Sequence, residues 1–105
     1  MNLENKVLKK DGQCWVGMVI KKEEADELYP QILKIRDKIY DEVSIPLEWK
    51  SPEDGRGVAS IGIVKDSVNF DDPSEAEQAI IWMAENGVEI YNAFLPYFEE
   101  LKFSK

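Results

Sequence analysis

Apolar residues recur at helical spacing through the last third of the chain, which predicts one long helix from Asp72 to Lys102 with shorter elements packed around it. The helix start is marked by Asp72-Pro73-Ser74-Glu75. We expect Asp72 to cap free backbone N–H groups, Pro73 to occupy the first helical position and Glu75 to reach back to the N–H of the cap. Because Pro96 lacks an N–H donor, it should kink the helix or break it, with a new helix starting at Pro96.

Two rows of apolar residues run along this predicted helix. A second row, formed by Ile81, Val88 and Leu95, lies well round the cylinder from the main stripe and leaves only a narrow polar arc. A helix that is apolar around more than half its girth is usually either deeply buried or at an interface. The pattern therefore favours a central core helix or a helix whose second row, with Trp82 near its border, contacts another chain. The main stripe, expected to face the core, comprises Ala76, Ile80, Met83, Gly87, Ile90, Phe94, Tyr97 and Leu101.

The first half of the chain predicts a hairpin and another helix. A weak strand at Lys6–Lys10 is followed by the turn signal Asp11-Gly12. The next strand, Gln13–Lys21, is apolar on both faces and should be central in a sheet. An amphipathic stripe over Lys22–Ser44 predicts one helix, bent near Pro30.

The middle of the chain predicts a second, antiparallel hairpin from Leu47–Lys50 and Val58–Lys65. The loop between them is dense in turn formers, and Arg56 is its candidate anchor for a partner. The element order predicts an α+β fold over residues 1–105, a single domain in which a small, mainly antiparallel sheet packs against two long helices.

Composition excludes several chemistries. The chain has no histidine and a single cysteine, which removes histidine-based catalysis, Cys/His zinc sites and intrachain disulfides. Its net charge of −8 argues against direct nucleic-acid binding. We expect no cofactor or metal, no membrane span or signal peptide, and a cytoplasmic protein.

Three candidate chemistries remain. Glu48 and Lys50 match half of a Mg²⁺-nuclease motif, with Asp41 or Glu42 as the upstream acid, but on a strand they would simply share the solvent face. Acids gathered in the last third, where residues 71–105 carry a net charge of −6, would let the protein imitate a phosphate row or would simply line a solvated helix. Cys14 lies in an apolar strand and is expected to be a core thiol.

Several segments resemble the bacterial domain of unknown function 4268. They are Pro46-Leu47-Glu48-Trp49, Ala59-Ser60-Ile61-Gly62-Ile63, Ile81-Trp82-Met83 and Ala93-Phe94-Leu95-Pro96, and the resemblance spans roughly residues 13–103. Domains of that family often follow a nuclease-like domain, so the resemblance implies an accessory module of restriction or defence proteins. It assigns no catalytic residues.

The sequence therefore predicts a non-enzymatic protein-interaction module. Its expected partner-binding residues are Ile81, Trp82, Val88, Leu95 and Arg56, and its expected partner is a second copy or a nuclease chain. An acidic inhibitor of a DNA-binding protein is the alternative, and a nuclease acting through Glu48 and Lys50 is the third hypothesis.

Overall fold

The computed structural model describes residues 2–43, 46–51 and 58–97, and it confirms the α+β class. Four strands and three α-helices alternate with two short 3₁₀ turns in this part of the chain. The elements are β1 (Asn2–Leu8), η1 (Lys9–Asp11), β2 (Gln13–Ile20), α1 (Lys22–Lys34), α2 (Arg36–Glu42), β3 (Glu48–Lys50), β4 (Ala59–Lys65), α3 (Pro73–Phe94) and η2 (Leu95–Tyr97).

The strands form one antiparallel sheet in the order β1-β2-β4-β3. Strand β2 is central, as its two apolar faces predict, and both predicted hairpins are present. The first begins earlier than predicted, at Asn2, and closes through η1 and Gly12. Gly12 has a left-handed φ of 63°, which suits glycine, and its carbonyl accepts a hydrogen bond from the Val68 N–H at 2.9 Å.

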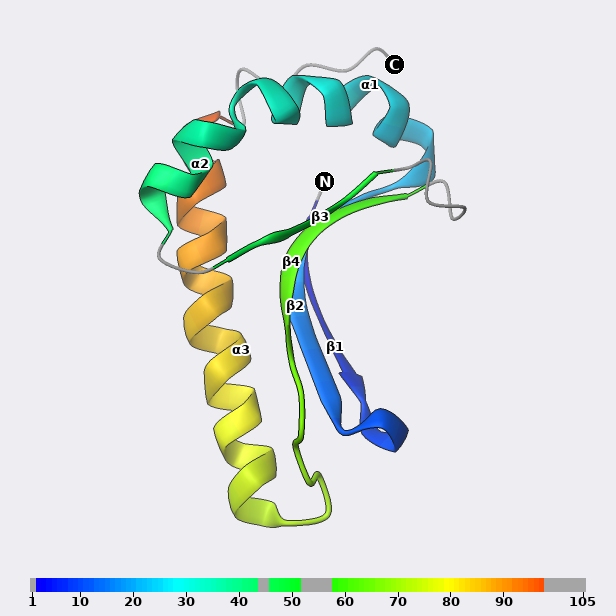
Figure 1. Ribbon diagram of the computed structural model, residues 1–105, viewed down its shortest axis with the longest axis vertical. Coiled ribbons are helices and arrows are strands. Elements are labelled where there is room, and N and C mark those ends of the chain that lie inside the picture. Colours follow the sequence, from blue (N-terminus) through cyan, green and yellow to red (C-terminus); the bar gives the residue numbers. More distant parts are fainter. Residues whose placement is uncertain (1, 44–45, 52–57, 98–105) are drawn as a thin grey trace.

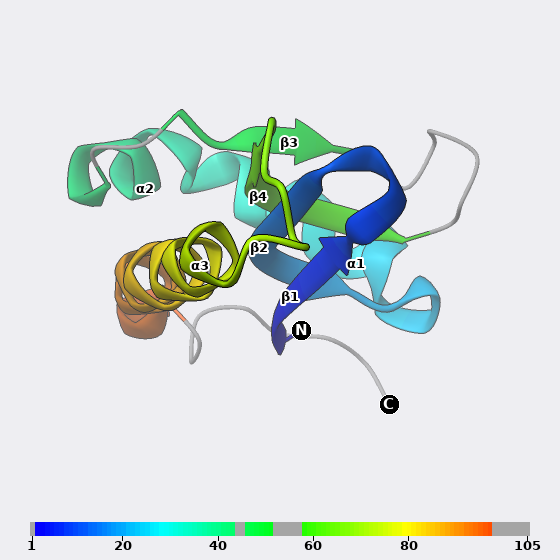
Figure 2. The same ribbon diagram turned by 90° about the horizontal axis from the view of Figure 1, so that it is seen from below.

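All three helices lie on one side of a strongly bent sheet (Figure 1). Helices α1 and α2 run across the top of that view and α3 runs down its left side, so the helices cover the convex face. Seen from below in Figure 2, α3 lies beside the sheet and the opposite face is not covered by a helix. The buried core lies between the sheet and the helices, where Val16, Met18, Ile61, Ile32 and Phe94 are fully or almost fully buried.

The predicted single helix over Lys22–Ser44 is wrong in one respect. The structure divides it at Ile35, which has φ −105° and ψ 8°, while Pro30 sits inside α1. Pro30 has no N–H to donate to the carbonyl of Asp26, four residues earlier. Both residues are exposed, so water can bind this carbonyl and the helix tolerates the proline.

The break at Ile35 turns α2 so that it reaches β3. Tyr40 of α2 donates its hydroxyl proton to the Leu47 carbonyl at 3.1 Å, and the Trp49 Nε1–H donates to the Tyr40 Oη at 2.8 Å. These two bonds tie the short edge strand to the helical layer.

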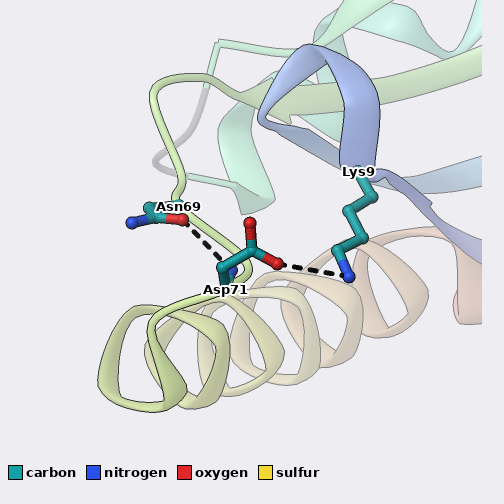
Figure 3. Close-up of polar contacts among 3 residues, drawn as sticks. All are labelled: Lys9, Asn69 and Asp71. Atoms are coloured by element: carbon teal, nitrogen blue, oxygen red, sulfur yellow. Dashed lines mark hydrogen bonds and ion pairs between the residues drawn. The ribbon is translucent and has the colours of Figure 1, made fainter.

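The start of α3 follows the prediction with one correction. Asp72 caps the helix by accepting the Ser74 N–H at 2.9 Å, but Glu75 accepts the N–H of Asn69 at 3.2 Å instead of returning to the cap. The residue before the cap, Asp71, forms an ion pair with the Lys9 ammonium at 3.4 Å, and the Asp71 N–H donates to the Asn69 Oδ1 at 3.1 Å (Figure 3). These contacts join η1 to the loop before α3.

The end of α3 agrees with the effect expected of Pro96. The α-helix stops at Phe94 and continues as the 3₁₀ turn η2, which contains Pro96. Residues 98–102 of the predicted helix, and Leu101 of its stripe, lie outside the described residues.

Candidate functional site

The inner face of α3 fixes which side of the helix remains available. Ala79, Met83, Gly87, Ile90 and Phe94 are buried against the sheet. Gly87 allows a close approach to the sheet, because a Cβ there would lie 3.2 Å from Val16 Cγ2 and 3.4 Å from Leu3 Cδ2. The helix therefore has a fixed rotation about its axis.

The predicted core stripe is wrong at Ile80. This side chain is 61% exposed, and Ala79 takes the buried position instead. The reason is geometric: Ala79, Ile90, Met83 and Gly87 span an arc of roughly 80° round the helix, and Ile80 lies just beyond the edge of that arc.

The second row predicted on this helix is exposed. Ile81, Val88 and Leu95 are 47%, 60% and 50% exposed. Ala84 and Tyr91, also exposed, lie between them, so apolar positions alternate three and four residues apart along the helix. This is the spacing of a seam that packs against another helix. We call Ile81, Ala84, Val88, Tyr91 and Leu95 the outer seam.

Ala84 and Tyr91 were not among the residues expected to bind a partner. The signal for them was present in the sequence, because they fall three residues after Ile81 and Val88. The spacing did not single them out, because the helix is apolar around most of its girth and several different rows of residues have the same spacing. Only the burial of the inner face selects this one.

Trp82 does not lie with the outer seam. It is rotated 100° from Ile81, is half-buried, and lines a groove of about 400 Å³ with Pro46, Ile63 and Val64. Its backbone carbonyl accepts the Asn86 Nδ2–H at 2.8 Å. The expected anchor Arg56 lies outside the described residues.

The charge of α3 has one sign. Between Pro73 and Phe94 the helix carries Glu75, Glu77, Glu85 and Glu89 and no lysine or arginine. The outer seam is thus apolar with acidic residues on the same helix. A surface of this kind attracts basic side chains at its rim and repels acidic ones.

The nuclease hypothesis gains no support from the geometry. Glu48 and Lys50 project from the sheet face opposite the helices, whereas Asp41 and Glu42 lie exposed at the end of α2. The described residues contain no group of three or more His, Cys, Asp or Glu side chains placed to hold a metal ion. Cys14 is fully buried, as predicted, and burial raises the pKa of its thiol although nearby Lys65 lowers it. Among the described residues, no helix is long and apolar enough to cross a membrane.

The domain of unknown function DUF4268 matches residues 2–98 of the chain. The protein belongs to this family. A comparison of this chain with the curated proteins and with the solved structures found no match. The family match confirms the predicted resemblance and extends it to β1, but it assigns no activity to any residue.

Proposed function

We propose that this DUF4268 protein is a non-enzymatic interaction module that binds a helix of a partner protein along the outer seam. The observation that carries the proposal is the seam itself, whose three largest aliphatic side chains are about half exposed on a helix already fixed by its inner face. Exposed apolar side chains scattered singly are ordinary, whereas a contiguous row is typical of a binding surface.

The spacing determines the shape of the occupant. From Ile81 to Leu95 the seam spans 15 residues, and the 14 steps between them cover roughly 21 Å at 1.5 Å per residue, which is about four helical turns. Alternating steps of three and four residues fit the knobs of a second helix lying nearly parallel or antiparallel to α3.

The charge argues for a partner different from this chain. A second copy would set the acidic helix α3 against another acidic helix, because α3 has no basic residue to offer in return. Like charges at the edge of such a seam oppose association, and opposite charges favour it. The proposed occupant is therefore an amphipathic helix with an apolar seam and lysine or arginine at its edges. A nuclease chain is the partner to test first, because similar domains adjoin nuclease domains.

The test uses a synthetic helical peptide with leucine at its seam positions and lysine at its edges, and a matched peptide with glutamate at the edges. We expect the lysine peptide to bind and the double variant Ile81→Asp, Val88→Asp to weaken its binding at least tenfold, since two carboxylates would have to be desolvated within the apolar contact. Gln78→Asp is the control, because it adds a charge to α3 outside the seam. Titration calorimetry supplies the affinities.

Two results for the double variant would contradict the proposal, and a third result would change its partner. One is unchanged binding of the lysine peptide to the double variant. The other is loss of the circular dichroism of the folded protein in the double variant, since that would place Ile81 and Val88 in the core. Dimerisation of the wild type that the double variant abolishes would assign the seam to a second copy and overturn the basic-helix partner.

The second candidate, an acidic inhibitor of a DNA-binding protein, is favoured by the all-acidic charge of α3. It predicts the opposite response to the same variants. Binding of a DNA-binding protein would weaken steeply with salt and would be kept or strengthened by the two added aspartates. Loss of binding in the double variant would exclude the inhibitor.

A further inference from the structure

The sheet has a second face that the helices do not use. Cys14, Val16, Met18 and Ile20 of β2 point into the core, so the alternate residues of β2 point to the opposite side. Because the sheet bends toward this side, the face is concave, and no described helix covers it (Figures 1 and 2).

The strand register places a glycine pair at the middle of this concave face. Gly17 of β2 is the partner of Gly62 of β4, and Trp15 and Val64 form the neighbouring pair. On the outer strands, Lys6 is the partner of Trp15 and Lys50 is the partner of Ser60. Residues from all four strands therefore meet around the two glycines.

The Trp15 indole packs against the glycine pair. A Cβ at Gly17 would lie 2.7 Å from Trp15 Cζ2, and a Cβ at Gly62 would lie 2.6 Å from the same atom. Neither position can carry a side chain while the indole stays where it is. The strand backbone thus occupies one side of the ring, and the Lys6 ammonium lies over the ring, 5.4 Å from its centroid.

A cavity of about 310 Å³ opens on this face. Trp15, Val64 and Ser60 contribute to its lining, and the charged groups among the described lining residues are Lys6, Lys50 and Glu48. In this described part of the lining, two lysines against one glutamate give a net positive charge, in a chain whose net charge is −8. The cavity therefore differs in sign from the protein that contains it.

We propose that this cavity binds a small planar aromatic anion, whose ring takes the place of the Lys6 ammonium over the outer face of Trp15 and whose carboxylate or phosphate pairs with the displaced Lys6 and with Lys50. The indole supplies a rigid surface for a second ring, and the ammonium groups form charge-assisted hydrogen bonds to an anion. The volume is near the lower limit of ligand sites, roughly 300 Å³, which fits one or two fused rings. A nucleic-acid strand does not fit, because the net charge of the whole chain repels a polyanion.

The experiment follows the three indole N–H resonances in NMR titrations with naphthalene-2-carboxylate as the probe. We expect Trp15 to shift, while Trp49, whose N–H is engaged by Tyr40, and Trp82, on the other side of the sheet, stay in place. Two matched probes separate the contributions: neutral naphthalene-2-methanol lacks the charge and cyclohexanecarboxylate lacks the planar ring. Each of these probes should bind at least about tenfold more weakly than naphthalene-2-carboxylate does. Tighter binding of adenosine monophosphate than of naphthalene-2-carboxylate would indicate a phosphate-bearing ligand, and weaker binding would indicate a carboxylate.

The lysines are tested by substitution. Lys6→Ala and Lys50→Ala should each weaken naphthalene-2-carboxylate about 5- to 30-fold and leave naphthalene-2-methanol unchanged, because each variant removes one ion pair to the anion. Lys34→Ala, at the exposed end of α1, is the control and should bind as the wild type does. Equal affinity for the charged and neutral naphthalenes, a shift confined to Trp82, or no Trp15 shift at millimolar probe would overturn the proposal.

Discussion

At the residue scale, two adjacent aspartates before α3 make polar contacts of different kinds. Asp72 accepts the Ser74 N–H at 2.9 Å and so satisfies a donor that the helix cannot pair internally. Asp71 pairs with Lys9 at 3.4 Å between side chains that are 83% and 68% exposed. Water and salt screen the ion pair, whereas the capping bond holds the first turn of the longest helix.

Substitution of the two aspartates should separate these effects. Asp72→Ala is expected to lower the free energy of unfolding by about 1 kcal/mol, because it removes the cap. Asp71→Ala should change it by less than about 0.5 kcal/mol, and it leaves the Asp71 N–H bond to Asn69 intact. Urea unfolding of both variants measures the difference, and equal losses would show that the ion pair matters as much as the cap.

At the element scale, α3 has one face for folding and another for binding. Gly87 brings the inner face within contact of β2 and β1, and the outer seam is left exposed on the far side. The start of α3 and the interruption near Pro96 were predictable because caps and proline act locally. The division of α1 from α2 at Ile35 was not predictable, because Pro30 gives the stronger local signal and tertiary packing of Ile39 and Tyr40 decides the turn.

Enlarging one residue on each face of α3 should change the stability by different amounts. Gly87→Leu is expected to destabilise the protein by about 1–3 kcal/mol, because the added side chain meets Val16 and Leu3 in a packed contact. Ala84→Leu on the outer seam should stay within about 0.5 kcal/mol of the wild type, because this position is exposed. Thermal unfolding of the two variants provides the comparison. Destabilisation by Ala84→Leu of the same size as by Gly87→Leu would mean that the outer seam is packed in the isolated protein.

At the scale of the whole molecule, the bent sheet separates two surfaces of different character. The convex side carries the helices and the outer seam, and the concave side carries Trp15 and the lysine-lined cavity. Cys14 lies in the core between them and is fully buried.

Cys14 should make stability depend on pH in the alkaline range. Burial raises the pKa of its thiol, so the folded state retains a proton that the unfolded state releases. This contribution to stability is fully present below the pKa of an exposed thiol, about 8.5, and is lost as the pH rises through the higher pKa of the folded state. Unfolding curves from pH 7 to 10 should show a decline for the wild type that is smaller in Cys14→Ala. An identical decline in both proteins would contradict this account.

The sequence by itself determined the α+β class, the central place of β2, the hairpins, the start and end signals of α3 and the second apolar row on that helix. These features follow from periodicity, caps and turns, which act over a few residues. Only the tertiary structure decided that Ala79 and not Ile80 is buried, that Trp82 lies apart from the outer seam, and that Gly17 and Gly62 meet under Trp15. Those outcomes depend on helix rotation and strand register, which contacts between distant segments set and which no local pattern specifies.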